Sequence, residues 1–371
     1  MSKKKLLIFH PTIAPYRIDL FNSLSKSFDV KVCLSYRNLR SQTFDYDSIE
    51  KQFLFKPHYL KKRFEIHNRV ICKGYWKEIK DFQPDIILCS EFGLDCISAL
   101  SFKRIYKKKY KVVSLCDDSF DMVNNNNDFS VFHKRMRKLL VPLLDSLILV
   151  EPDTTRWYLN NYGKGIYFPI VSEDDKTRTC YKKALPITKK YIEKYQLMGK
   201  KVFLFVGRLV KIKNVKQLIE SFEEAGIEDA ILVIVGDGEE RDNLKKQSEG
   251  LSSKIIFTGR LEGDSLYAWY NLASCFVLPS LKEPFGAVTN EALLGGAKVI
   301  VSEKAGSKCL VVQNINGLTF NPDKENALKQ SMVKISSNID KVEAHDDLRI
   351  SMMQKTYTDY FNDLKKSLLE I

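Results

Sequence analysis

The stretch PSLKEPFGAVTNEALLGG, residues 279–296, decides the fold of this chain. It joins the apolar run Cys275–Leu278 to a segment of small and apolar residues that begins near Ala287. A short apolar run, a proline-containing turn and a helix-length segment are typical of a buried parallel strand that leads into a helix. A structural connection needs only a turn residue and a cap, whereas this one also carries Glu283 and Glu291. The stretch therefore indicates an α/β unit with functional side chains beyond one end of a strand.

The same alternation of short apolar runs and amphipathic segments extends along most of the chain. It is the pattern of parallel sheets that helices cover on both faces. A chain of 371 residues exceeds what one hydrophobic core usually supports, so we expect two domains. The pattern predicts two Rossmann-like, doubly wound units, with strands at Lys5–Phe9, Val30–Ser35, Asp85–Cys89, Lys111–Cys116, Ser146–Val150, a short one near Tyr167, Lys201–Val206, Ala230–Val235, Lys254–Phe257, Cys275–Leu278 and Lys298–Val301.

A polar, charge-dense segment, residues 172–201, lies between the two series of strands and contains Pro186. Its composition is typical of a linker or a peripheral segment. We therefore expect a first domain over residues 1–170 and a second over residues 171–353. Residues from about 354 to 371 have apolar positions spaced at three and four, which predicts a helix that packs back on the first domain.

Composition limits the class of protein. The chain is 44% hydrophobic and 28% charged, as globular proteins are, and its net charge of +13 favours anionic partners. The eight cysteines lack the close spacing of a zinc site, so we expect buried thiols in a reducing compartment. The apolar run after the basic start is too short for a signal peptide, and the longest apolar stretch is broken by Pro142 and Asp145. These features predict a cytoplasmic protein, either in solution or peripheral on the inner face of the cell membrane.

The loops that follow the strands are the places to search, because ligands of open parallel sheets bind beyond the carboxyl ends of the strands. Gly207 and Arg208 come directly after a predicted strand, and Lys213 precedes the next helix. Two cations beside a helix N-terminus make a diphosphate site that needs no metal ion, since the free N–H groups and the helix dipole add to their charge. The alternative is that Lys213 is a solvated helix residue and Arg208 an ion-pair partner.

Two further loops carry glycines. Gly236 and Gly238 flank Asp237 after one strand, and such turns often serve only to reverse the chain. Gly259 follows the next strand, where the absence of a side chain lets a ligand approach the backbone, so a planar base could stack beside Leu261.

The quoted stretch suits one extended ligand that contains a sugar, a phosphate and a ribose. Glu283 in the turn can bind sugar hydroxyls or a developing positive centre, and Glu291 can accept hydrogen bonds from ribose hydroxyls. The N–H groups of Phe285, Gly286 and Ala287 would face a phosphate. The alternative is a pair of solvent-facing glutamates around an ordinary turn.

Together these motifs resemble the family 4 glycosyltransferases, which have the GT-B fold of two Rossmann-like domains facing a cleft. The resemblance rests on Gly207-Arg208 with Lys213-Asn214, and on VGDGEER, IIFTGRL and EPFGAVTNEA, and it is specific over about residues 200–320. It implies transfer of a sugar from a nucleotide-sugar donor, with retention of the anomeric configuration and with neither a metal ion nor another cofactor. It also implies that Arg208 and Lys213 bind the diphosphate, Glu283 the donor sugar and Glu291 the ribose.

The resemblance places the acceptor in the amino-terminal half. The stretch HPTIAPYRIDLFNSL, residues 10–24, resembles the family's first loop, although Ala14-Pro15 stand where many members have paired glycines. We therefore assign no phosphate contact to this loop. Tyr16 and Arg17 are the acceptor-side candidates, with the alternative that they only cap and pack the following helix.

Asp117 and Asp118 follow another predicted strand. Members of the family often have a His or Asp in this region that faces the reacting sugar, and we favour Asp117 for that role. Both residues could instead be ordinary turn aspartates.

The basic charge gathers in FKRIYKKKYK, residues 102–111, and FHKRMRKLL, residues 132–140. Their apolar residues have helical spacing, which suits contact with an anionic membrane that carries lipid-linked acceptors; solvated helix faces are the alternative. Nucleic acid fits poorly, because no binding motif accompanies the charge.

We therefore predict a hexosyltransferase that transfers a sugar to a glycan or lipid-linked acceptor in the biosynthesis of a surface polysaccharide or glycoconjugate. The alternatives are a nucleotide-sugar 2-epimerase of the same fold and a non-catalytic protein that binds sugar nucleotides.

Overall fold

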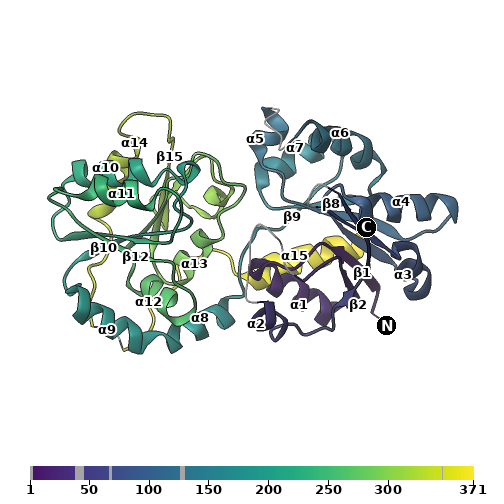
Figure 1. The fold of residues 1–371 in the computed structure, drawn as a ribbon, viewed down its shortest axis with the longest axis horizontal. Helices are drawn as coiled ribbons and strands as arrows, with labels where there is room; N and C mark the ends of the chain where they lie inside the picture. The colour runs from purple at the N-terminus through teal and green to yellow at the C-terminus, as the bar shows by residue number, and fades with distance from the viewer. Residues whose placement is uncertain (1–2, 38–45, 67–68, 126–129, 345) are drawn as a thin grey trace. The chain divides into compact units, whose positions relative to one another are not determined.

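The computed structural model describes residues 3–37, 46–66, 69–125, 130–344 and 346–371 (Figure 1). The chain forms two compact units. The first comprises Met1–Ile170 together with Thr358–Ile371, and the second comprises Val171–Tyr357. The chain thus leaves the first unit after Ile170 and returns to it at its carboxyl end.

The first unit is built on a seven-stranded parallel sheet with the strand order β3-β2-β1-β6-β7-β8-β9. The order reverses between β1 and β6, which makes the junction of these two strands the switch point of a doubly wound sheet. A separate antiparallel pair, β4 and β5, completes the strands of this unit. The strands are β1 (Lys5–His10), β2 (Asp29–Leu34), β3 (His58–Tyr59), β4 (Lys61–Ile66), β5 (Arg69–Lys73), β6 (Ile86–Ser90), β7 (Lys111–Cys116), β8 (Ser146–Leu149) and β9 (Ile166–Tyr167).

Helices cover the first sheet because its central strands are apolar on both faces, as Leu6, Leu7 and Ile8 of β1 show by being fully buried. The last helix, α15, is drawn in yellow in Figure 1, and it packs in this unit through the fully buried Leu364 and through Tyr360, whose ring lies 5.9 Å from that of Tyr167. The helices are η1 (Pro15–Arg17), α1 (Ile18–Ser27), α2 (Tyr46–Glu50), α3 (Tyr75–Phe82), α4 (Leu94–Ile105), α5 (Phe120–Asn124), α6 (Val131–Leu140), η2 (Val141–Leu143), α7 (Pro152–Tyr162) and α15 (Tyr357–Glu370).

The second unit contains a six-stranded parallel sheet with the order β12-β11-β10-β13-β14-β15. Its switch point lies between β10 and β13. The strands are β10 (Lys201–Val206), β11 (Ala230–Val235), β12 (Lys254–Gly259), β13 (Cys275–Leu278), β14 (Lys298–Ser302) and β15 (Gly317–Phe320). The helices are α8 (Asp174–Lys183), α9 (Leu185–Tyr195), η3 (Lys211–Lys213), α10 (Val215–Ala225), α11 (Arg241–Ser248), α12 (Gly263–Leu272), α13 (Val288–Leu294), η4 (Gly306–Leu310) and α14 (Ala327–Ser336).

The predicted α/β class with two doubly wound parallel sheets is confirmed, and each predicted strand is present within one or two residues of its expected bounds. The prediction missed β3, β4, β5 and β15. Strand β3 has only two residues, β4 reads KKRFEI and has no apolar run, and the apolar run of β5, RVICK, is only three residues long between two charged ones. Pattern reading finds buried parallel strands far more readily than short or polar ones.

Of the two interpretations of residues 172–201, a linker is excluded, because this segment forms α8 and α9 and packs in the second unit, as the predicted domain boundary at residue 171 requires. Tyr181 is fully buried, and its hydroxyl donates to the carbonyl oxygen of Glu291 at 2.9 Å. The side-chain amide of Asn271, in α12, donates to the carbonyl of Tyr181 at 2.9 Å and to the hydroxyl of Thr188 at 3.1 Å. The many lysines lie on the outer faces of two helices whose inner positions are buried.

Six of the eight cysteines are buried free thiols, as predicted, and Cys180 and Cys309 are partly exposed. Among the helices that the structure describes, none combines the length and the apolar character that a bilayer span requires.

Candidate active site

Two loops meet at the switch point of the second sheet. Strand β10 pairs directly with β13, so the loops that follow Val206 and Leu278 leave the sheet side by side. The N–H of Leu281 donates to the carbonyl of Ile212 at 2.9 Å, and the side chain of Asn214 donates to the carbonyl of Pro279 at 3.3 Å. The stretch over residues 279–296 is thus joined by hydrogen bonds to the Gly207–Lys213 loop.

These loops bring together Lys213 and Glu283, whose side chains form an ion pair and are only 18% and 14% exposed. Lys213 is therefore not the solvated helix residue of the alternative interpretation. Arg208 is exposed at the start of the same loop, and its guanidinium forms no hydrogen bond or ion pair with any residue of the described ranges. One paired cation, one unpaired cation and one carboxylate therefore border the carboxyl ends of β10 and β13.

The glycines of the Gly-Asp-Gly turn fix the position of the Arg208 loop. A Cβ atom at Gly236 would lie 1.8 Å from the carbonyl oxygen of Gly207, and one at Gly238 would lie 2.3 Å from that of Leu209. The N–H of Leu209 also donates to the carbonyl of Asp237 at 2.9 Å. Only glycine permits this close approach. The turn therefore positions the Arg208 loop by packing against its backbone.

The backbone before α13 is held rigidly. The N–H of Gly306 donates to the carbonyl of Glu283 at 3.1 Å, and that of Ser307 donates to Phe285 at 2.7 Å. Gly286 has a φ of 96°, where a Cβ atom would also lie 2.6 Å from the side chain of Leu278. The N–H groups of Phe285, Gly286 and Ala287 donate to no other described residue, as expected for groups that face a ligand.

Glu291 and Leu261 lie farther along the same edge. Glu291 is the fourth residue of α13, and its carboxylate accepts a hydrogen bond from the hydroxyl of Tyr270 at 2.6 Å. Burial raises the pKa of Glu291 above its ordinary value. Leu261 follows β12, two strands from β10 and so about 10 Å away across the sheet. In the strand order, β13 and β12 lie on opposite sides of β10, and the ribose contact of Glu291 and the base contact near Leu261 stay predictions.

In the first unit, Arg17 and Asp117 are ion-paired. Arg17 is only 3% exposed, and one of its terminal nitrogens meets no hydrogen-bond acceptor. The Asp117 side chain is 34% exposed, whereas neighbouring Tyr16 is exposed and lies beside the Arg17 guanidinium. Tyr16 and Asp117 are thus accessible to a ligand. Arg17 is buried and holds Asp117 by their ion pair.

Asp118 is fully buried and has a structural environment. It accepts hydrogen bonds from His133 Nε2 at 2.8 Å, from Arg137 Nη1 at 3.2 Å and from the hydroxyl of Tyr158 at 2.6 Å. Burial opposes ionisation, but the hydrogen bonds from His133 and Tyr158 bring the pKa of Asp118 below its ordinary value. Of the two aspartates, Asp117 is the one whose side chain reaches solvent, and its contact with a sugar stays a prediction.

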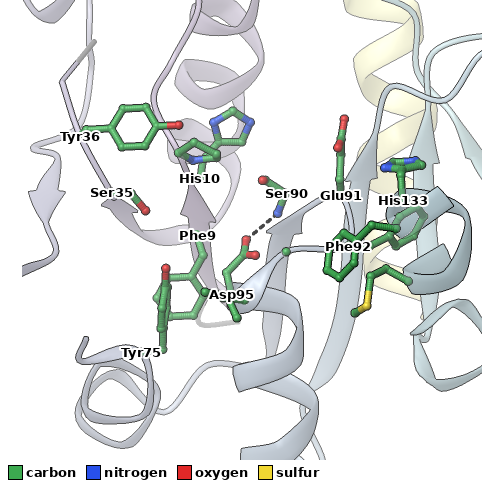
Figure 2. A pocket seen from close by; sticks show the side chains of 15 residues that line it. Phe9, His10, Ser35, Tyr36, Tyr75, Ser90, Glu91, Phe92, Asp95 and His133 are labelled. Carbon is green, nitrogen blue, oxygen red and sulfur yellow. Dashed lines mark hydrogen bonds between the residues drawn. The ribbon is translucent and has the colours of Figure 1, made fainter. Parts of the chain in front are cut away.

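The sequence interpretation missed Glu91, which lines a cavity of about 420 Å³ in the first unit together with His133 (Figure 2). Burial, followed by the charges of Asp117 and Asp118, raises the pKa of Glu91 to about 7. Glu91 directly follows β6. A search of the loops beyond the carboxyl ends of the strands, which found Arg208, would therefore also have found Glu91.

Comparison with known proteins finds a family match within the second unit. The family model described as "Glycosyl transferases group 1" matches residues 188–349. The matched residues lie within the second unit and make up less than half of the chain. The finer assignment to family 4 stays a prediction.

Parts of two curated glycosyltransferases also match this chain. An uncharacterized glycosyltransferase of Methanocaldococcus jannaschii is 33% identical over 37% of this chain and 36% of its own length. A second one from that organism is 24% identical over 68% of this chain and 66% of its own. The matches therefore span about a third and just under two thirds of these relatives.

The fold is shared over the entire chain. The structure of HepE from Anabaena, in complex with UDP and glucose, superimposes with a TM-score of 0.68 at 14% identity, covering 99% of this chain and all of that one. This likeness, together with the two parallel sheets, identifies the GT-B fold. Within the described ranges, no three His, Cys, Asp or Glu side chains converge to hold a metal ion, and metal independence stays a prediction.

We predict that Glu91→Gln stabilises the protein above neutral pH. The folded state raises the pKa of Glu91 from 4.5 to about 7, so ionisation weakens folding progressively as pH rises from 4.5 through 7. The free energy of unfolding in urea should be about 1 to 3 kcal/mol higher for the variant at pH 8, and this difference should shrink toward pH 5. Glu370→Gln, the same change on an exposed helix end, should have no effect at either pH. A Glu91→Gln protein less stable than the natural one at pH 8 would contradict the assigned environment.

Proposed function

We propose that the protein is a retaining, metal-independent glycosyltransferase that moves a sugar from a nucleotide-sugar donor to a glycan or a lipid-linked acceptor. The observation that supports this most strongly is the meeting of Arg208, Lys213 and Glu283 at the switch point of the second sheet. The donor diphosphate would lie against the two cations and the free N–H groups that precede α13.

In this mechanism the cations stabilise the leaving nucleoside diphosphate as the glycosidic bond lengthens. Glu283 binds the donor sugar, and its pairing with Lys213 couples the sugar side of the site to the phosphate side. The acceptor hydroxyl attacks the anomeric carbon from the face that the diphosphate leaves. Its proton passes to a phosphate oxygen of the departing group, which keeps the proton balance without a further base.

The comparisons support a nucleotide-sugar donor. HepE, with the same fold, is described as bound to UDP and glucose. Another relative, a Corynebacterium glutamicum protein described as a GDP-mannose-dependent alpha-mannosyltransferase, is 26% identical over 65% of this chain. Since these two donors differ in base and sugar, we leave both open for this chain.

Two other functions are compatible with the same fold, namely a nucleotide-sugar 2-epimerase and a non-catalytic binding protein. Release of nucleoside diphosphate that depends on an added acceptor distinguishes the transferase from both. An epimerase would convert the sugar nucleotide without an acceptor, and a binding protein would leave it unchanged.

Donor binding tests the proposed cation site. In thermal-shift titrations with UDP, GDP and ADP in EDTA, we expect at least one nucleoside diphosphate to raise the melting temperature of the natural protein. Arg208→Ala and Lys213→Ala should each weaken that binding about 10- to 100-fold, because each removes a charge-assisted hydrogen bond. Lys211→Ala, which removes an exposed lysine from the same short helix, is the matched control and should bind normally. Normal binding by both site variants, or binding only with added divalent metal, would contradict the proposal.

Surface features of the first unit support a membrane-bound acceptor. Leu139, in α6, and Leu143, in η2, are 64% and 57% exposed, and α6 also carries the exposed Arg135 and Lys138. Not all of the basic segment is available, because Arg137 is buried against Asp118. The remaining exposed apolar and basic side chains are those that bind an anionic bilayer.

We predict that the protein cosediments with vesicles containing about a third anionic lipid and less with purely zwitterionic vesicles. The double variant Leu139→Asp with Leu143→Asp should lose most of this binding and keep its melting temperature, since both side chains are exposed. Leu369→Asp, at an exposed leucine of α15, serves as the control. Equal sedimentation of all three proteins would remove the membrane proposal and leave the donor site unaffected.

A further inference from the structure

The cavity of the first unit lies at the carboxyl ends of β1, β2 and β6, at the switch point of that sheet. Its volume of about 420 Å³ falls within the usual range of small-molecule sites, roughly 300 to 1,000 Å³. Figure 2 shows aromatic side chains and a few polar ones around it. The aromatic lining consists of Phe9, Tyr36, Tyr75, Phe92 and Phe132. Such a lining suits a ligand that has both apolar faces and hydrogen-bonding edges, as a sugar ring has.

Glu91 is held in this cavity at a cost to stability. Its φ of 44° is in the left-handed region, which disfavours residues other than glycine. Its N–H donates to the carbonyl of Leu115 at 2.8 Å, and its carbonyl accepts from the hydroxyl of Ser114 at 2.5 Å. Asp95 accepts from the N–H of Ser90 at 2.8 Å and closes the turn on the other side. The surrounding structure therefore enforces a strained conformation that aims one carboxylate into the cavity.

The carboxylate of Glu91 has no hydrogen bond or ion pair with any described residue, the residue is only partly exposed to solvent, and burial is the first cause of its raised pKa. A desolvated acceptor without a donor is unfavourable, and backbone strain adds to the cost. A ligand that donates hydrogen bonds to this carboxylate would offset the free energy lost to the unsatisfied acceptor and to the strained backbone.

A second acceptor faces the same cavity. His10 Nδ1 lies 2.5 Å from the carbonyl oxygen of Thr12, which can only accept, so Nδ1 carries the proton. Burial, followed by the nearby charge of Arg17, lowers the pKa of His10 to about 4, and the ring is neutral at physiological pH. Nε2 is then an acceptor as well.

Positive charge is not available to match these acceptors. Among the described residues that line the cavity, none is a lysine or an arginine. His133 lines it, but its ring is bound to the buried carboxylate of Asp118, which raises the pKa of His133 and neutralises a protonated ring. Arg17, whose charge acts on His10, is not among the lining residues, and one of its terminal nitrogens is paired with Asp117. Acceptors without a free cation attract hydroxyl groups and disfavour phosphate.

We propose that this cavity binds the uncharged ring of a glycan acceptor, with Glu91 and His10 accepting hydrogen bonds from its hydroxyls, and that it discriminates against phosphorylated sugars. This inference rests on the proposed transferase function and specifies its acceptor. The acceptor is the neutral sugar end of a growing glycan, whether that glycan is free or attached to a lipid.

Saturation-transfer NMR can test this with a panel of methyl hexosides and methyl N-acetylhexosaminides, each paired with the corresponding sugar 6-phosphate. We expect at least one neutral glycoside to bind the natural protein, and its phosphorylated counterpart to bind at least tenfold more weakly. At pH 8, where Glu91 is mostly ionised, Glu91→Gln should weaken binding of that glycoside about tenfold, the effect of losing one charge-assisted hydrogen bond. Glu370→Gln is the matched control and should bind as the natural protein does.

The thermal shift with nucleoside diphosphates, measured on the same samples, separates this inference from the proposed function. Glu91→Gln should keep its response to the nucleotide, which would also show that the variant is folded. If nucleotides bind but no neutral glycoside does, if the phosphates bind as well as the neutral sugars, or if Glu91→Gln binds normally, the inference is wrong and the donor site stands. If no nucleotide binds to the natural protein, the proposed function itself fails.

Discussion

The direct pairing of β10 with β13 is the constraint on which the site depends. Neighbouring parallel strands end at the same edge, so two loops separated by about 70 residues of sequence emerge together there. The ion pair between Lys213 and Glu283 is the chemical result. Glycines at 236 and 238 then let a third loop approach closely enough to fix the backbone beside Arg208.

The first unit also has polar residues at the switch point of its parallel sheet, but their charge is different. Its sheet also reverses strand order beside its first strand, and polar residues again follow the strands: Glu91 after β6 and Asp117 after β7. Whereas the second unit presents cations, the first presents carboxylates, of which one is paired with the buried Arg17 and one is unpaired. This difference in charge is consistent with an anionic donor in one unit and an uncharged acceptor in the other. It also means that the first unit carries a desolvated carboxylate that lowers its stability, a frequent property of functional sites.

Much of the fold could be predicted from the sequence because its central strands are buried on both faces and therefore form short, uninterrupted apolar runs. The candidate residues Arg208, Lys213 and Glu283 could be predicted from the sequence for the same reason, since they lie in the loops that follow such runs. The burial of Asp118 could not be predicted from the sequence. Its hydrogen-bond partners, which are His133, Arg137 and Tyr158, lie 15 to 40 residues away along the chain. Nor could composition show that the lysine-rich segment over α8 and α9 hides buried positions such as Tyr181. Long-range hydrogen bonds and local strain, such as the backbone of Glu91, become visible only in three dimensions.

A crystal structure of the full chain with the nucleoside diphosphate that binds best, grown in EDTA, would test the cation site most directly. We expect diphosphate oxygens about 3 Å from Lys213 Nζ and from the Arg208 guanidinium, with no metal ion between them. A diphosphate bound elsewhere on the chain, with Arg208 and Lys213 making no contact to it, would contradict the proposed site.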